Sequence, residues 1–185
     1  MVKKNGLSTD DLMILHRELS ILSKLDCPNI VKYLENYEDE NYIYICMELL
    51  QGGESGDLMM RMGRPFNEAE LASMTKHMIC ALNHCHGQNI IHRDIKPANM
   101  MIDDCGETKL IDFGLAVAKS KKESMLNPLS GTPLFMAPEV LTSDYGIASD
   151  IWSLGATLFY LGSAQFPFDI FGKETLDDLT EKIRK

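Results

Sequence analysis

The stretch "HRDIKPANMMIDDCGETKLIDFG", from His92 to Gly114, decides how the whole sequence is interpreted. It contains two short apolar runs, "NMMID" and "TKLID", which are separated by the turn signal "DCGE". Apolar runs bounded in this way predict two short strands. Four polar residues flank or interrupt these runs, and we expect them to meet in a cleft. They are Asp94, Lys96, Asn99 and Asp112.

These four residues carry the groups that phosphoryl transfer requires. Asp94 can accept the proton of an attacking hydroxyl group, and Lys96 can neutralise charge on the transferred group. Asn99 and Asp112 offer the amide and carboxylate oxygens that Mg²⁺, a hard ion, prefers. Because the reaction depends mainly on positioning and electrostatic stabilisation, it needs little covalent help from the protein.

The composition is that of a single globular domain, with 45% hydrophobic and 24% charged residues among 185. A formal net charge of −9 disfavours nucleic acid and anionic membrane surfaces as partners. No apolar run approaches the ~18 residues that a membrane-spanning helix needs. The five cysteines contain no CxxC pair, which indicates reduced thiols in a cytoplasmic protein.

Outside the opening stretch, the pattern predicts a helix, a small sheet and then a helical body. Residues 8–25 predict a helix that begins with a capping box of Ser8 and Asp11. The runs "IVKYLENY" and "YIYICMELL" predict a hairpin, and "QGGESG" after them predicts a flexible joint. Three further helices are expected in "NEAELASMTKHMICALNHCH", in "DIWSLGATLFYLGSA", which should be buried, and in "KETLDDLTEKIRK".

Several motifs occur together in an order and spacing that resemble the eukaryotic protein kinase family. "HRDIKPAN" resembles the catalytic loop, "DFG" at Asp112–Gly114 the metal-binding motif, and "APE" at Ala137–Glu139 the end of the activation segment. "SDIWSLG" resembles the start of a buried helix whose aspartate, here Asp150, braces the catalytic loop. Lys96 and "GTP" at Gly131–Pro133 resemble the serine/threonine type. "CPNIV" and "MELLQGGE" are similar to calcium/calmodulin-dependent and calcium-dependent protein kinases.

The resemblance implies an α+β, two-lobe fold that is incomplete at both ends. Residues 1–50 would form a partial N-terminal lobe, consisting of helix C and a β-hairpin, together with the hinge. Residues 51–185 would form a mostly helical partial C-terminal lobe. The implied activity is transfer of the γ-phosphate of ATP, with Mg²⁺, to Ser or Thr of protein substrates. Asp94 would be the catalytic base, and any regulatory segment would lie outside this chain.

By resemblance, Glu18 is the helix C glutamate that pairs with a strand lysine. Its alternative role is that of an exposed helix glutamate, since no such lysine is found in this chain. Thr132 would bond to the catalytic Asp and Lys. Glu54 would contact the ribose or a basic substrate residue.

The resemblance also assigns residues to the nucleotide pocket. Met47 would be the gatekeeper, and the backbone of Glu48 to Leu50 would bind adenine. A plain core role is the alternative for Met47 and for Met101, the other methionine of the expected pocket. His92 is expected to pack in the spine that links the lobes, with Leu22, Tyr33 and Phe113, rather than to act as a base.

Two features of the family are missing from the sequence. There is no GxGxxG loop, and "VKK" near the start resembles only the tail of the strand that carries the phosphate-binding lysine, so Lys3 and Lys4 are poor substitutes. Ser55 and Gly56 stand where bulky apolar residues are usual, which should weaken a helix there. The alternative hypothesis is therefore a catalytically inactive, pseudokinase-like interaction module, and we expect weak or no activity from these residues alone.

Overall fold

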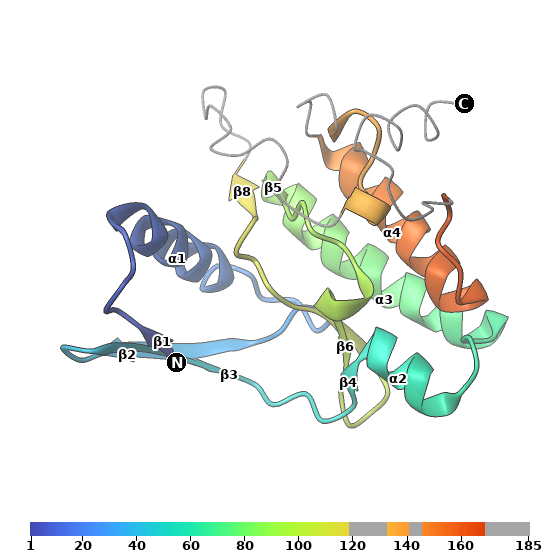
Figure 1. Cartoon of the computed structure of the whole chain (residues 1–185), viewed down its shortest axis with the longest axis horizontal. Coiled ribbons are helices and arrows are strands. Elements are labelled where there is room, and N and C mark those ends of the chain that lie inside the picture. The colour runs from blue at the N-terminus through green and yellow to red at the C-terminus, as the bar shows by residue number, and fades with distance from the viewer. Residues whose placement is uncertain (119–132, 141–145, 169–185) are drawn as a thin grey trace.

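The computed structural model describes residues 1–118, 133–140 and 146–168. A three-stranded antiparallel sheet with one long helix above it joins a body in which helices predominate (Figure 1). This arrangement confirms the expected α+β class. The amphipathic helix expected in residues 173–185 lies outside the described residues.

The helices are α1 (Thr9–Leu22), α2 (Ser55–Met62), α3 (Glu68–Gly87) and α4 (Ile147–Ser163). The strands are β1 (Val2–Lys3), β2 (Tyr33–Glu38), β3 (Tyr42–Met47), β4 (Gly53–Glu54), β5 (Ile90–Ile91), β6 (Met100–Ile102), β7 (Thr108–Leu110) and β8 (Val117–Ala118). Two single 3₁₀ turns cover Pro97–Asn99 and Pro133–Phe135. Both strands expected in the opening stretch are thus confirmed as β6 and β7.

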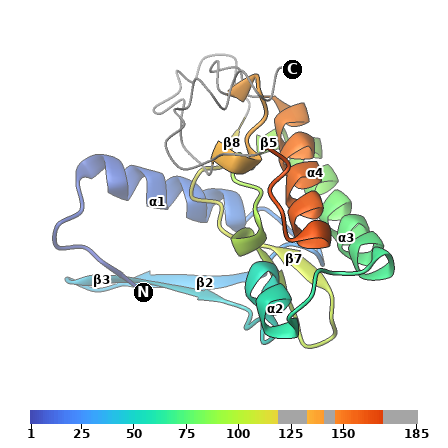
Figure 2. The same ribbon diagram turned by 45° about the vertical axis from the view of Figure 1, so that its right-hand side comes forward.

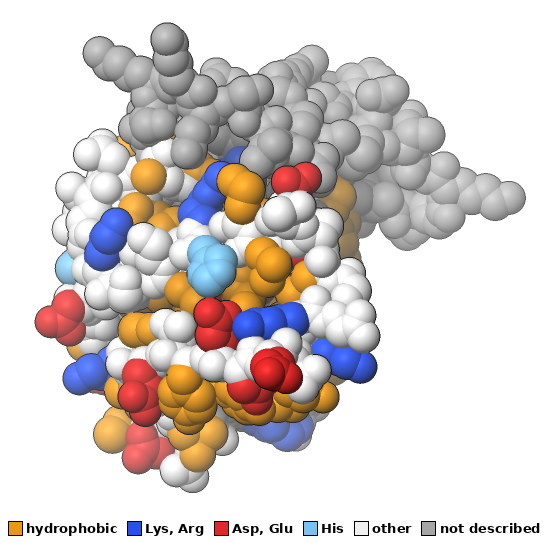
Figure 3. Space-filling model, turned by 90° about the vertical axis from the view of Figure 1, so that its left-hand side faces the viewer, with side chains coloured by type: hydrophobic (Ala, Val, Ile, Leu, Met, Phe, Trp, Pro, Cys, Tyr) orange, Lys and Arg blue, Asp and Glu red, His pale blue; other side chains and the backbone are white. Residues whose placement is uncertain are grey.

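The N-terminal sheet has the order β1-β3-β2, and β2 and β3 form the predicted hairpin. The side chain of Asp39 fixes its turn by accepting hydrogen bonds from the backbone N–H of Asn41 and Tyr42, at 2.7 and 2.8 Å. Seen from the side of α1 and this hairpin, the surface shows hydrophobic side chains between charged ones (Figure 3). Met13 and Leu34, 62% and 56% exposed, are examples from α1 and β2.

Helix α1 begins at the predicted capping box: Ser8 Oγ accepts from the N–H of Asp11 at 3.1 Å, and Asp11 accepts from the N–H of Ser8 at 2.8 Å. It ends at Leu22, three residues before the predicted boundary. Leu25 extends the apolar pattern, but it is buried after a turn in which its N–H bonds to Leu22. The extra apolar residue therefore belongs to the core and not to the helix.

The prediction of a flexible joint in residues 51–56 is wrong, because this segment forms β4 and the start of α2. Gly52 donates its N–H to the carbonyl of Ile102 at 2.9 Å. A Cβ at Gly52 would lie 2.7 Å from that same oxygen, so only glycine permits this approach. Gly52 therefore serves close packing of the chain before β4 on Ile102 of β6.

The small residues at the start of α2 have a similar explanation. Ser55 is fully buried and donates its hydroxyl to the carbonyl of Pro97 at 2.8 Å. A Cβ at Gly56 would lie 3.2 Å from the Cβ of Pro97. Bulkier residues at these positions would push α2 away from the turn Pro97–Asn99. Their cost in helix propensity is therefore offset by contact with the loop that carries the candidate catalytic residues.

Helices α3 and α4 lie side by side in both ribbon views (Figures 1 and 2). They approach closely at Gly162, where an added Cβ would lie 2.7 Å from Cδ1 of Leu71. The prediction that α4 is buried holds for one side only, because Ile151 and Phe159 are 45% and 50% exposed. Among the described helices, none has both the length and the apolar character to cross a membrane.

One hydrophobic cluster connects the sheet side of the molecule to the helical body. It includes Leu22 and Ile30 from the N-terminal part and Met78, Leu82 and Leu110 from the rest. Ile30 also forms a parallel bridge with Leu110 of β7. The segment that follows α1 is therefore held directly against the strand that leads to Asp112.

Candidate active site

Asp94, Lys96 and Asn99 lie together on the loop between β5 and β6. The Nζ of Lys96 lies 2.6 Å from Oδ2 of Asp94, and Nδ2 of Asn99 donates to the same oxygen at 3.0 Å. Asn99 Nδ2 also donates to the backbone carbonyl of Asp94 at 2.8 Å. Two donors thus converge on one oxygen of a carboxylate that is only 7% exposed. Its other oxygen, Oδ1, can accept a proton from an incoming group.

The β6–β7 hairpin brings Asp112 to this loop. The register pairs Met100 with Leu110, and the N–H of Ile111 then donates to the carbonyl of Asn99 at 3.0 Å. Asp112 is the next residue, so it follows directly on a segment bonded to Asn99. Strand β8, which follows Asp112, pairs with β5, so the chain after Asp112 lies beside the start of the loop that carries Asp94. The sequence predicted this meeting, although it gave no sign of the two-residue strand β8.

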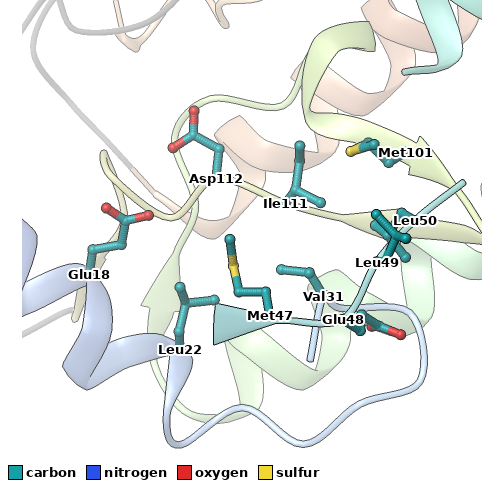
Figure 4. A pocket seen from close by; sticks show the side chains of 10 residues that line it. All are labelled: Glu18, Leu22, Val31, Met47, Glu48, Leu49, Leu50, Met101, Ile111 and Asp112. Atoms are coloured by element: carbon teal, nitrogen blue, oxygen red, sulfur yellow. The ribbon is translucent and has the colours of Figure 1, made fainter. Parts of the chain in front are cut away.

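A cavity of about 410 Å³ opens in front of Asp112 (Figure 4). The residues predicted around a nucleotide all line it, with the exception of Glu54. The lining residues are Glu18, Leu22, Val31, Met47, Glu48, Leu49, Leu50, Met101, Ile111 and Asp112. Its walls are mostly apolar, and Figure 4 shows the carboxylates of Glu18 and Asp112 on the same side of it.

Glu18 and Asp112 make this end of the cavity electronegative. The pKa of Glu18 is raised by burial and, next, by the charge of Asp112, while the backbone N–H of Phe113 opposes the shift. Among the described residues, no lysine or arginine forms an ion pair with Glu18. Lys4, one of the two poor substitutes, is engaged elsewhere: its Nζ lies 2.9 Å from Glu38 and 2.6 Å from the carbonyl of Asp39.

Two residues beside the site have left-handed backbone conformations. Arg93 has φ = 71° and Asp112 has φ = 61°, a region that costs a non-glycine residue on the order of 1–3 kcal/mol. The strain at Arg93 is held by Asp150 at the start of α4. Its carboxylate accepts from the N–H of His92 at 3.0 Å and from the N–H of Arg93 at 2.9 Å. The predicted bracing role of Asp150 is therefore confirmed.

His92 is fully buried and is not placed to act as a base. Its ring lies edge-on to Phe113 at 4.8 Å, and burial lowers the pKa of the imidazole. In the neutral form, Nε2 donates to the carbonyl of Ile111 at 3.1 Å, and Nδ1 accepts from the N–H of Asp94 at 3.3 Å. The predicted packing of His92 against Phe113 is thus confirmed. Through its hydrogen bonds, His92 joins the segment that carries Asp94 to the segment that carries Asp112.

Glu48 takes a role that the sequence did not indicate. Both of its carboxylate oxygens contact Nζ of Lys109 on β7, at 2.8 and 2.9 Å, and one accepts from the N–H of Lys32 at 2.7 Å. The side chain therefore fixes the connection between β3 and β4, which leaves the backbone of Glu48 to Leu50 to line the cavity. Lys109 lies between buried Thr108 and Leu110, so its side chain lies on the opposite face of β7, where its contact with Glu48 leaves it 12% exposed.

Glu54 lies away from the first cavity, in a neighbouring hollow of about 270 Å³ that Lys96 also lines. Apolar side chains form much of its wall, among them Phe135, Tyr160 and Phe166. The amine of Lys96 thus stands between Asp94 and this hollow. Thr132, the remaining predicted site residue, lies outside the described residues.

Comparisons with known proteins agree with this geometry. The family description "protein kinase domain" matches residues 1–185. The chain is 38% identical over 174 residues to "Calcium-dependent protein kinase 5" of Plasmodium berghei (strain Anka), covering 92% of this chain and 30% of the relative. It is 36% identical over 171 residues to "Serine/threonine-protein kinase PEPKR2" of Arabidopsis thaliana, covering 92% and 35%.

A third similar protein is "Calcium/calmodulin-dependent protein kinase kinase" of Caenorhabditis elegans, 38% identical over 164 residues, with 85% of this chain and 30% of the relative covered. The chain thus spans about a third of the length of the curated relatives it matches. These matches confirm the predicted resemblance to serine/threonine kinases of the calcium-dependent and calmodulin-dependent kind. With a family match over its whole length and such relatives, the chain belongs to the protein kinase family.

Proposed function

We propose that this chain carries the phosphoryl-transfer site of a serine/threonine protein kinase, which moves the γ-phosphate of ATP to a Ser or Thr hydroxyl of a protein substrate. The observation that carries the proposal is the convergence of Lys96 and Asn99 on one oxygen of Asp94. This cluster lies beside a cavity whose far wall is apolar and whose near end bears two carboxylates.

The cavity suits the base of a nucleotide. Its volume of about 410 Å³ is within the range of small-molecule sites, roughly 300–1,000 Å³. Met47, Leu50 and Met101 offer apolar surface on which a flat ring can lie. The backbone from Glu48 to Leu50 borders the same space and can supply hydrogen bonds to the edge of the ring.

Asn99 and Asp112 fit the requirements of a magnesium site. Since Nδ2 of Asn99 donates to Asp94, its carbonyl oxygen Oδ1 is the atom available as a ligand. Asp112 is exposed and faces Glu18, and this pair of carboxylates favours a cation. When bound, Mg²⁺ would offset the negative charge of the phosphate groups.

Asp94 is suited to orient the attacking hydroxyl and accept its proton on Oδ1. Lys96 holds the carboxylate by its other oxygen and presents positive charge where negative charge develops on the transferred group. The same lysine borders the hollow that contains Glu54, so a substrate side chain entering from that side would reach Asp94. A reducing compartment such as the cytoplasm suits the free cysteines of the described residues.

The experiment measures binding and transfer separately. Thermal melting of the chain with Mg·ATP at 100 times its Kd should show about 2.7 kcal/mol of stabilisation. Asp94→Asn should keep that shift, whereas the transfer to a Ser-containing peptide, which we expect to be weak in these residues alone, should fall by about 10²–10⁴-fold. Asp104→Asn, at an exposed turn position, is the matched control and should retain both.

Two results would contradict the proposal. Undiminished transfer in Asp94→Asn would remove this residue from the mechanism. Absence of any Mg·ATP-dependent shift would instead favour the non-catalytic interaction module. Because binding and transfer are read independently, the two failures are distinguishable.

A further inference from the structure

Two cysteines that are far apart in the sequence touch in the fold. The Sγ atoms of Cys27 and Cys80 lie 3.9 Å apart, although 53 positions separate the residues. Cys27 lies in the turn that follows α1, and Cys80 lies within α3. The two cysteines do not have CxxC spacing, and neither of them lines the cavity beside Asp112. The other three cysteines of the described residues are in no such contact.

The separation is short enough for a covalent bond. A disulfide requires about 2.05 Å between the sulfurs, so rotation of the two side chains has to close a gap of about 1.9 Å. The backbone around Cys27 is already held by hydrogen bonds, and Cys80 lies within α3. The carbonyl of Cys27 accepts a hydrogen bond from the N–H of Ile30 at 3.1 Å. The side-chain amide of Asn29, two residues after Cys27, donates a hydrogen bond to the carbonyl of Thr108 at 3.2 Å.

We propose that Cys27 and Cys80 form an intramolecular disulfide when the protein meets a peroxide. In the first step, the thiolate of Cys80 attacks one oxygen of hydrogen peroxide, which forms an S–O bond and breaks the O–O bond. Water leaves after protonation, and Cys80 is now a sulfenic acid. The thiolate of Cys27 then attacks this sulfur, which forms the S–S bond and releases the second oxygen as water.

The net reaction oxidises two thiols to one disulfide and reduces one peroxide to two waters. A dithiol reductant reverses it by thiol–disulfide exchange. The two cysteines divide these steps because their environments differ. Cys80 is exposed and can meet the peroxide, whereas Cys27 is half-buried against the core. Burial raises the pKa of the Cys27 thiol, so Cys27 is the less reactive of the two toward peroxide and its place in the second step rests on its contact with Cys80.

The remaining cysteines are poorly placed to compete. Cys85 is fully buried, and burial raises its pKa to about 12, so it is an inert core thiol. Cys46 contacts the hydroxyl of Tyr37 at 3.5 Å on the hairpin. Cys105 is exposed in the β6–β7 turn and can form at most a bond between molecules.

The bond would tie the end of α1 to the helical body. That segment is already held to β7 by the bridge between Ile30 and Leu110. A disulfide would add a covalent link between the turn that contains Cys27 and helix α3. Helix α1 carries Glu18, so the cross-link restricts movement of the helix that borders the cavity. The chemistry itself does not depend on the proposed phosphoryl transfer.

The test treats the dilute full chain with hydrogen peroxide and analyses it without reductant. We expect a monomer whose mass has fallen by two hydrogen atoms, a peptide pair joined through Cys27 and Cys80, and full reversal by dithiothreitol. The melting temperature of the oxidised form should rise, because the bond closes a long loop in the unfolded chain. Cys105→Ser is the matched control and should behave like the unmodified protein.

Cys27→Ser provides the second measurement, because it leaves the exposed thiol without its partner. In this variant the sulfenic acid at Cys80 should persist and be trapped by dimedone. In the unmodified protein trapping should be at least tenfold lower. The proposal is overturned if peroxide gives only disulfides between molecules, or if dimedone labels Cys80 equally in both proteins.

Discussion

The carboxylate of Asp150 on α4 lies 2.7 Å from Nε2 of His86 on α3. The same carboxylate accepts from the backbone N–H of His92 and of Arg93, so three donors converge on a side chain that is 1% exposed. The two helices and the loop that carries Asp94 are therefore joined at one buried group. The position of the loop that carries Asp94 therefore depends on the carboxylate of Asp150, which is not itself one of the proposed catalytic groups.

We expect Asp150→Asn to destabilise the chain by about 1–3 kcal/mol, the cost of leaving a buried donor without an acceptor. An asparagine presents an oxygen to one backbone N–H but an NH₂ group to another donor. Urea unfolding monitored by circular dichroism measures the change. Asp104→Asn serves as the control, and equal stability of the two variants would contradict the bracing role.

The stability of the chain should also reveal the raised pKa of Glu18. The folded chain holds the proton of such an acid more tightly than the unfolded chain, whose pKa is 4.5, so the protonated acid stabilises the fold below pH 4.5. This stabilisation is lost as the pH rises through the higher pKa of the folded state. Glu18→Gln should therefore melt at a higher temperature than the unmodified chain at neutral pH and at the same temperature below 4.5. Glu40→Gln, at an exposed position of the hairpin turn, is the matched control for the loss of one carboxylate.

Glu70 should behave in the opposite way. Its hydrogen bonds from Arg64 and from the N–H of Asn67 lower its pKa to about 2. A lowered pKa stabilises the fold above the unfolded value of 4.5, and this stabilisation is lost as the pH falls through about 2. Glu70→Gln should reduce the melting temperature at neutral pH, and the difference should narrow below pH 4.5. A side-chain NMR titration with a midpoint above 4.5 would be incompatible with this geometry.

Gly162 and Gly155 offer a matched pair on α4. A Cβ at Gly155 meets nothing within 4 Å, so Gly155→Ala should stabilise by about 0.5–1 kcal/mol through helix propensity alone. At Gly162 the contact with Leu71 should remove this gain or add a net cost of about 1–2 kcal/mol.

A double-mutant cycle isolates the contact of Gly162. In the background Leu71→Ala, the change Gly162→Ala should recover the gain seen at Gly155, because the clashing Cδ1 is gone. Strict additivity of the two changes would show that the helices do not meet at this point. Chemical denaturation of the four proteins supplies the free energies of unfolding.

The sequence predicted what depends on near neighbours. Asp94, Lys96 and Asn99 lie within six positions, so a short loop must bring them together, and the hairpin that follows adds Asp112. The capping box of α1 was equally local. Errors arose where a residue type has two uses. Gly52 and Gly53 were interpreted as a flexible joint, whereas Gly52 permits close packing on Ile102 and Gly53 adopts a left-handed backbone with φ = 81°.

Relationships between distant residues that the family resemblance did not imply were beyond the sequence. Glu48 and Lys109 are separated by 61 positions, and neither occupies a position whose neighbours indicate the other. The contact of Cys27 with Cys80 is of the same kind. Periodicity reports which face of an element is buried, but not which other element covers it. Such pairs are found only once the fold has placed their backbones.

The hydrogen bond between Asp150 and Arg93 spans 57 positions. Until α4 has docked, Asp150 cannot accept from the N–H of Arg93, so this restraint on the left-handed backbone there is missing. During synthesis the loop leaves the ribosome well before the helix that shapes it. We therefore expect the loop that carries Asp94 to acquire its final geometry only when α4 packs against it.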